Sequence, residues 1–235
     1  RLPVKEAQRK YDATFADITT NMAKAESHLD RDARGLLASE SYTYGEIDFV
    51  SFVSVMRSIR PRPGWTMADL GSGSGRALVS AALLFDFSKV VGYEALGRLH
   101  ALSQQAIAAY NHEQTSSHAL ATDNTVMEVH NTSFLDADWS DHDIVFANST
   151  CFDDSLMRKL ATHAESLKGG AYFVTFTRPL ESDCFRVLSQ RRYAMAWGPA
   201  TVFIHRRLRT GDGPSMPVTD DSLMDMLVDV NTDES

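Results

Sequence analysis

The sequence predicts an α/β fold in which helices cover both faces of a seven-stranded, mostly parallel sheet. An apolar stretch ends in an acidic residue and a glycine-rich turn at residues 69–75, and a helical pattern follows directly. Short strand patterns then alternate with helical patterns along the chain. Two further strand patterns flank Gly198-Pro199 and predict a closing hairpin. A helical segment at the N-terminus is expected to precede the sheet.

The glycine-rich turn carries a specific signal. Gly71, Gly73 and Gly75 let the backbone turn sharply and approach a ligand, where any side chain would collide. A dinucleotide fingerprint needs glycine at the sixth position, which here is Arg76, so nicotinamide binding is disfavoured. The next strand pattern ends at Glu94, an acid suited to paired ribose hydroxyls. Together these residues resemble the S-adenosylmethionine site of Rossmann-like methyltransferases, which bind a nucleoside without phosphate; a turn in some other α/β domain is the alternative.

Length and composition fit one domain. At 235 residues the chain is long enough for one full-sized α/β domain with additions. Hydrophobic residues make up 43% and charged residues 23%, and no apolar run approaches the roughly 18 residues of a membrane span. We therefore expect a soluble protein without membrane contact. The start at Arg1 shows no signal-peptide pattern, which suggests a trimmed chain and constrains localisation poorly.

Charge and cysteine content exclude some kinds of partner. The net charge is −8, and the seven acids after Arg209 account for all but one unit of it. The body is thus near neutral and lacks a long basic arm, so nucleic-acid contact should be weak at most. Cys151 and Cys184 form no Cys-x-x-Cys pair, and the histidines show no zinc-ligand spacing. We expect reduced thiols and no metal.

Two helices are predicted before the glycine turn. Residues 4–28 carry apolar side chains at three- and four-residue steps, which favours one amphipathic helix packed on the core: Tyr11, Phe15, Ile18 and Met22. Further on, Gly45 permits a tight turn, and Glu46 and Asp48 place negative charge at the first turn of a helix over residues 49–56. A simple helix cap is the alternative to a ligand-covering role for this segment.

The remaining elements follow from local patterns. We expect helices over 76–85, 96–110, 153 to about 168, and 180–190. Strands are expected at 66–70, 89–94, 125–130, 143–148, 171–177, 193–197 and 201–205, and a surface loop at 111–124. The chain thus divides into an N-terminal helical segment with a loop (1–60), a core (61–209) and an acidic, flexible tail (210–235).

Several candidate residues lie where strands are predicted to end. In open α/β sheets, ligands bind at the carboxyl ends of the strands. The residues at these ends are expected to gather around one crevice: Gly71, Glu94, Ser133, Phe134 and Asn148.

A narrower family resemblance rests on motifs spread from about Tyr42 to His205. They are Tyr44-Gly45-Glu46, the turn Asp69 to Gly75, Gly92-Tyr93-Glu94, Phe134-Leu135, Val145 to Asn148, Phe152 and Leu167 to Gly170. In this order they resemble the disruptor-of-telomeric-silencing family of histone lysine methyltransferases. The stretch from Trp197 to His205 resembles the closing hairpin of that family.

The resemblance implies S-adenosylmethionine as cofactor, a core histone as protein substrate, and the nucleus as location. It implies that Tyr44, Gly45, Glu46 and Ile47 cover the cofactor and that Asp69, Gly71, Ser72, Gly73, Gly75 and Arg76 line it. Glu94 would hold the ribose, Ser133 and Phe134 would flank the adenine, and Asn148 and Phe152 would lie near the methyl group.

Transfer to lysine requires a neutral amine, and an aromatic channel favours that form because it disfavours the charged one. Phe152 and Phe203 are the candidates for this channel, with plain core packing as the alternative for Phe203.

Departures from the family pattern leave two rival functions open. Ser133 replaces an acid, Arg76 an amide and Ser149-Thr150-Cys151 a more apolar run, while Val202 and Phe203 stand where tyrosines are usual. One rival is methylation of RNA or a small molecule, although the Asn/Asp-Pro-Pro-aromatic motif of base methylases is missing at Asn148. The other is a non-catalytic module that binds S-adenosylmethionine. Oligomeric state is not encoded in these patterns.

Overall fold

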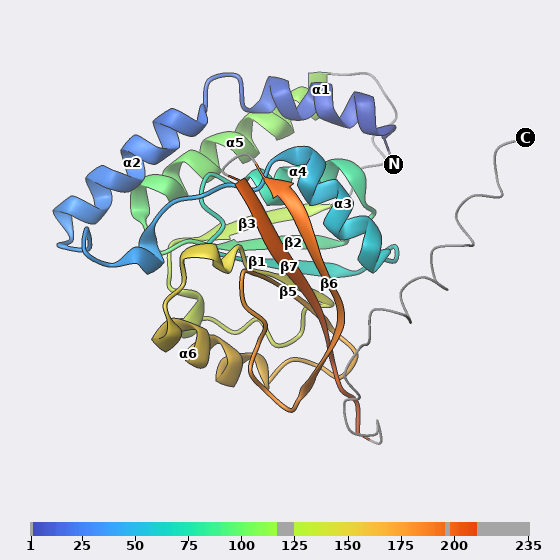
Figure 1. The fold of residues 1–235 in the computed structure, drawn as a ribbon. Helices are drawn as coiled ribbons and strands as arrows, with labels where there is room; N and C mark the ends of the chain where they lie inside the picture. Colours follow the sequence, from blue (N-terminus) through green and yellow to red (C-terminus); the bar gives the residue numbers. More distant parts are fainter. Residues whose placement is uncertain (1, 117–124, 196–197, 211–235) are drawn as a thin grey trace, which may run out of the picture.

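The computed structural model describes residues 2–116, 125–195 and 198–210. Its seven strands form one sheet in the order β3-β2-β1-β4-β5-β7-β6 (Figure 1). β1 to β5 pair in parallel, and β7 and β6 run antiparallel at one edge. The strands are β1 (Thr66–Leu70), β2 (Lys89–Tyr93), β3 (Val126–His130), β4 (Ile144–Phe146), β5 (Tyr172–Phe176), β6 (Phe185–Met195) and β7 (Gly198–Arg207). The predicted Rossmann-like fold class is confirmed.

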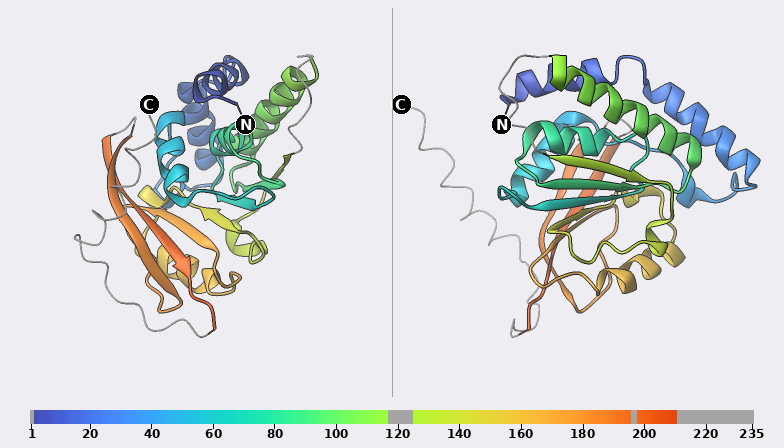
Figure 2. Two further views of the ribbon diagram at one scale, coloured as in Figure 1. Left: turned by 90° about the vertical axis from the view of Figure 1, so that its right-hand side faces the viewer. Right: turned by 180° about the vertical axis from the view of Figure 1, so that it is seen from behind.

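Helices cover both faces of this sheet, as expected (Figure 2). They are α1 (Val4–Thr14), α2 (Thr20–Ala33), α3 (Phe49–Ile59), α4 (Arg76–Leu84), α5 (Gly97–Ser116) and α6 (Asp154–Ala164). Alternate residues of β1, β2, β4 and β5 enter opposite cores: Met67 and Val90 pack with α1, α3, α4 and α5, whereas Ala68 and Val91 pack with α6. Burial on both faces explains why these strands read as nearly continuous apolar runs.

Acidic caps set the start of two helices. The Asp48 carboxylate accepts the Ser51 N–H at 2.9 Å and begins α3, and Asp153 accepts the Leu156 N–H at 2.8 Å and begins α6. Each cap satisfies an N–H group that has no partner within its helix. Glu46 was expected in the first turn of α3, which is wrong, because the helix starts at Phe49 and Glu46 turns toward α4.

The single helix expected over residues 4–28 is wrong. The chain forms α1 and α2, separated by a turn at residues 15–19. The Thr19 hydroxyl accepts the Met22 N–H at 3.1 Å and starts a new helix. This break lets Phe15 and Ile18 reach the core, while Met22 stays 43% exposed.

The helix expected over residues 180–190 is also wrong. β6 occupies Phe185–Met195 and pairs with β7 along its length, with an irregularity between Val187 and Ser189. Pairing with a distant strand outweighed the local helical pattern, since strand preference depends on neighbours that a local reading omits. The irregularity also interrupts the alternation of side chains that identifies a strand.

Two helix ends differ from expectation. α5 extends to Ser116, so the surface loop expected over residues 111–124 is wrong for residues 111–116. The polar residues there are tolerated because an exposed helix face accepts them. α6 ends at Ala164, and the N–H groups that follow bond three residues back, Glu165 to the Thr162 carbonyl and Leu167 to the Ala164 carbonyl. The rest of that predicted loop, Trp197 and the tail beyond residue 210 lie outside the described residues. Within the described ranges, no helix is long and apolar enough to cross a membrane.

Candidate cofactor site

The glycine turn lies at the carboxyl end of β1. Gly71, Gly73 and Gly75 have φ values of +80°, +54° and +85°, which side chains rarely allow. The Gly71 and Ser72 N–H groups donate to the Tyr93 carbonyl at 2.9 and 3.1 Å and so fix the turn to the end of β2. Gly75 then begins α4. The local pattern therefore builds a turn in which the backbone at Gly71 has open space beside it.

Glu94 stabilises this turn through its carboxylate group. One carboxylate oxygen accepts the Gly73 N–H at 2.8 Å, and the other accepts the Leu96 N–H at 2.8 Å. The side chain is buried, and burial raises its pKa, although these backbone N–H groups act in the opposite direction. Glu94 thus connects the glycine turn with the beginning of α5.

We call residues 43–48 the covering loop, because they lie on the glycine turn. The Tyr44 hydroxyl donates to the Ser74 hydroxyl at 3.0 Å, and a Cβ added to Gly73 would lie 2.6 Å from the Tyr44 ring. Asn148, just after β4, donates its side-chain N–H to the Gly45 carbonyl at 2.9 Å. The loop is therefore closed against both the turn and the sheet edge.

Beneath the covering loop is a cavity of only about 30 Å³. Ten of the predicted site residues line it: Tyr44, Gly45, Glu46, Ile47, Asp69, Gly71, Ser72, Gly73, Arg76 and Asn148. The structure thus brings these positions together from segments far apart in sequence. Of the five residues that the carboxyl-end argument placed in one crevice, Gly71 and Asn148 line this cavity, whereas Glu94, Ser133 and Phe134 do not.

The cavity has an acidic floor. Asp69 is buried, and burial together with the charge of Glu94 raises the pKa of Asp69 to about 8. Arg76 is the only lysine or arginine among the described residues that line the cavity. At neutral pH the protonated Asp69 suits hydroxyl groups as partners, and a cation placed beside it would favour its ionised form.

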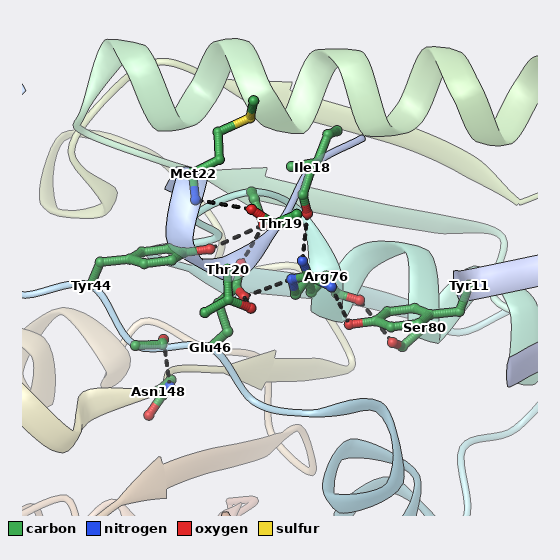
Figure 3. Close-up of polar contacts among 12 residues, drawn as sticks. Tyr11, Ile18, Thr19, Thr20, Met22, Tyr44, Glu46, Arg76, Ser80 and Asn148 are labelled. Carbon is green, nitrogen blue, oxygen red and sulfur yellow. Dashed lines mark hydrogen bonds and ion pairs between the residues drawn. The ribbon is translucent and has the colours of Figure 1, made fainter. Parts of the chain in front are cut away.

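Arg76 and Glu46 form the polar centre of the region (Figure 3). The Arg76 Nε atom lies 2.6 Å from a Glu46 carboxylate oxygen. Two further Arg76 nitrogens donate to the Tyr11 hydroxyl at 3.0 Å and to the Ile18 carbonyl at 2.7 Å. Burial opposes the charge of Arg76, but the Tyr11 and Glu46 oxygens raise its pKa above the ordinary value.

The residues predicted to flank the adenine, Ser133 and Phe134, do not line the small cavity. The Ser133 hydroxyl accepts the Leu135 N–H at 3.2 Å and borders a cavity of about 670 Å³ with Ala95 and Asp136. The rings of Phe134 and Phe152 stack with centroids 5.7 Å apart, so these two candidates are in contact.

Phe203 lies elsewhere on the sheet. It belongs to β7, where its ring stacks on His205 with centroids 6.2 Å apart. It is buried but does not line the cavities described for the other candidates.

A third cavity, of about 570 Å³, lies between the covering loop and the N-terminal helices. Tyr11 of α1 and Thr20 of α2 line one side, and Asn148 and Cys151 line the other. Asn148 borders both this cavity and the small one beneath the loop. Its side-chain oxygen accepts the Thr150 hydroxyl at 3.0 Å, which fixes the orientation of the amide.

Sequence reasoning missed three residues of this region. Ser74 joins Tyr44 to Glu46, and Tyr11 and Thr20 reach the loop network from the N-terminal helices. Tyr11 was interpreted as core packing only. The one available signal was the unusual Arg76, a buried cation that required partners.

Comparison with known proteins matches this region to one family. The model of the family described as "Histone methylation protein DOT1" matches residues 33–195, which include the covering loop, the glycine turn and Asn148. No curated protein sequence is significantly similar to this chain.

Solved structures with a similar fold include three bacterial proteins. TrmN from Thermus thermophilus is 17% identical with a TM-score of 0.52, over 72% of this chain and 52% of that one. A putative methyltransferase, yhhF, from Escherichia coli is 17% identical with a TM-score of 0.52, over 70% and 88%. Magnesium protoporphyrin IX methyltransferase from Synechocystis PCC 6803, solved with bound S-adenosylmethionine, is 13% identical with a TM-score of 0.50, over 88% and 98%. At such identities the likeness concerns the fold.

Proposed function

Because this chain belongs to the DOT1 histone methylation family, we propose that it transfers methyl groups from S-adenosylmethionine to lysine side chains of a core histone in the nucleus. Membership of the family makes the chain a methyltransferase with S-adenosylmethionine as its cofactor. The observation that carries the proposal is the meeting of the covering loop, the glycine turn, Glu94 and Asn148 at one sheet edge.

The residues present fit this cofactor. Asp69 and Glu94 offer acidic oxygens, which suit ribose hydroxyls and the positive charges of a sulfonium and an amino group. At Gly73 the missing side chain lets a flat group lie directly on the backbone, as the Tyr44 ring does. The cofactor supplies an electrophilic methyl group when bound. Gly71 to Gly75 and Glu94 would hold its nucleoside.

The covering loop must move for this binding. Ligand pockets usually measure about 300–1,000 Å³, whereas the cavity beneath the loop measures about 30 Å³. Tyr44 lies directly on Gly73 and fills the space over the turn. We therefore assign the loop the role of a lid that opens for the cofactor and closes over it.

Asn148 and Phe152 are assigned to the lysine side of the reaction. The amine must be neutral and aligned with the methyl group, so the protein contributes position and removal of water. The contacts of Asn148 with Gly45 and Thr150 support a role in orienting groups at the reacting centre. The stack of Phe152 on Phe134 supports an apolar wall near the cofactor, whereas Phe203 has its contact with His205 and is the weaker candidate.

The charge of the chain favours free histones over nucleosomal DNA. The body is near neutral and the segment after Arg209 is acidic, so phosphate contacts should be few. Basic histones face no such repulsion. We expect feeble activity on nucleosomes and stronger activity on free histones.

The test is a transfer assay with radiolabelled S-adenosylmethionine on free core histones, nucleosomes and RNA, followed by mass spectrometry of the products. Asn148→Ala should lower kcat on the order of a hundredfold with little change in cofactor affinity, because its interaction is made mainly in the transition state. Gln190→Ala, at an exposed amide on β6, is the matched control and should keep full activity. Label on RNA alone, or full activity in Asn148→Ala, would overturn the lysine proposal.

A further inference from the structure

The N-terminal helices are joined to the covering loop by a buried network. Arg76, the first residue of α4, has a side chain only 13% exposed. Its guanidinium lies over the Phe15 ring at 4.3 Å and near the Tyr11 ring at 5.7 Å. The cation is therefore enclosed by α1 and the turn after it, where its charge requires firm partners.

The polar contacts of Arg76 belong to three separate segments. One guanidinium nitrogen donates to the Tyr11 hydroxyl in α1, and a second donates to the Ile18 carbonyl in the α1–α2 turn. The third nitrogen pairs with Glu46 in the covering loop. A guanidinium can serve all three because its N–H groups point outward in a fixed fork. A neutral amide has donors on one nitrogen only and cannot span the same three acceptors.

Glu46 is the residue of the covering loop that accepts the contacts of this network. One carboxylate oxygen accepts the Ser74 hydroxyl at 2.5 Å, and the other accepts the Thr20 hydroxyl at 2.9 Å beside the Arg76 contact. Thr20 begins α2, and Ser74 belongs to the glycine turn, which also receives the Tyr44 hydroxyl. Figure 3 shows the Arg76 and Thr20 side chains beside the Glu46 carboxylate. The loop is thus tied to the N-terminal helices both directly and through Arg76.

We infer that Arg76 and Glu46 form a latch through which helices α1 and α2 hold the covering loop closed on the glycine turn. Arg76 is a positioning residue in this account, since it acts through Glu46. This inference rests on the proposed function only in calling the loop a cofactor lid. The latch itself needs no ligand, because all of its contacts lie within the protein. Opening the lid then requires that the Glu46 contacts break, so the N-terminal helices set how often the crevice opens.

The test measures loop opening in the full chain without cofactor, by amide hydrogen exchange and by limited proteolysis within residues 41–47. Arg76→Gln should speed exchange of loop amides 43–48 by roughly tenfold or more, because hydrogen bonds to a charged group are lost. Tyr11→Phe should speed it by a smaller factor, since only a hydroxyl is removed while the ring keeps its contacts with Phe15 and Phe49. Amides of β1 should keep their exchange rates.

Arg98→Gln is the matched control. It breaks a 2.8 Å ion pair between Arg98 of α5 and Glu26 of α2, which also ties an N-terminal helix to the core but lies outside the network. Its loop exchange should equal that of the unmodified chain. In a double-mutant cycle, the effects of Tyr11→Phe and Glu46→Gln on the exchange rates of the loop amides should depart from additivity by about two- to tenfold. Most of this coupling should disappear when Arg76→Gln is also present.

Two results would overturn the latch. One is unchanged loop exchange in both Arg76→Gln and Tyr11→Phe; the other is equal acceleration in the loop and in β1, which would indicate only a less stable fold. S-adenosylhomocysteine added to the unmodified chain separates the two proposals. Loop protection by this compound with no effect of Arg76→Gln rejects the latch alone, whereas a working latch without such protection rejects the proposed cofactor site.

Discussion

At the scale of single residues, the two buried acids of the crevice determine its chemistry. Asp69 and Glu94 lie under the glycine turn, and burial raises the pKa of both. Two buried acids close together destabilise a protein once they ionise, unless a positive ligand compensates. The arrangement is therefore costly for the protein alone and favourable for a protein that binds a cation there.

Asp69→Asn should reveal this cost as a pH dependence. The folded pKa of Asp69 is about 8 against 3.8 in an unfolded chain, so the folded state keeps a proton that the unfolded state releases. Stability from this group is complete below pH 3.8 and is lost as pH rises through 8. The variant cannot titrate, so its unfolding free energy relative to the unmodified chain should rise by up to about 1.4 kcal/mol per pH unit. Denaturant unfolding at pH 5, 6, 7 and 8 measures it, and a difference independent of pH would contradict the account.

At the scale of elements, one imidazole adds side-chain contacts to the backbone pairing that joins the antiparallel edge to the parallel sheet. His205 of β7 accepts the Leu180 N–H at 3.0 Å through Nε2, so Nδ1 carries the proton and donates to the Phe173 carbonyl at 3.0 Å. Burial lowers the pKa of His205 to about 4, although the bond to Phe173 acts in the opposite direction. The ring thus stays neutral and connects β7 with β5 and with the segment before β6.

His205→Gln should flatten the acid limb of the stability curve. The folded pKa of about 4 lies below the ordinary value of 6.5, so the unfolded state binds the proton more readily. Stability from His205 is present above pH 6.5 and is lost as pH falls toward 4, by up to about 1.4 kcal/mol per pH unit. Thermal unfolding between pH 4.5 and 7 measures both chains. An identical dependence of stability on pH in the variant and the unmodified chain would show that His205 does not titrate as its burial implies.

At the scale of the whole molecule, the parallel sheet and its crevice were predictable because their signals are local. The glycine turn from Gly71, the acid at Glu94 and the caps at Asp48 and Asp153 each express a backbone requirement within a few residues. The ends of β1 and β4 then bring Asp69, Gly71 and Asn148 to one small cavity.

Features that depend on distant partners were not predictable in the same way. β6 exists because β7 pairs with it, and no local pattern encodes that partner. Arg76 meets Tyr11 across 65 positions of sequence, so the hydroxyl could not be told from a core side chain. Ser133 and Phe203 were placed by resemblance, and their roles remain predictions.

Binding of S-adenosylmethionine at the crevice is the central claim, and calorimetric titration tests it most directly. The unmodified chain should bind the cofactor, and Glu94→Ala should bind it about ten- to a hundredfold more weakly, because charged hydrogen bonds to the ribose are lost. Glu94→Gln keeps the size of the side chain but only one of the two acceptor oxygens, so either the Gly73 or the Leu96 N–H group loses its partner in this variant. Thermal unfolding confirms that each variant is folded. Equal affinity in a folded Glu94→Ala chain, or no binding by the unmodified chain, would contradict the account.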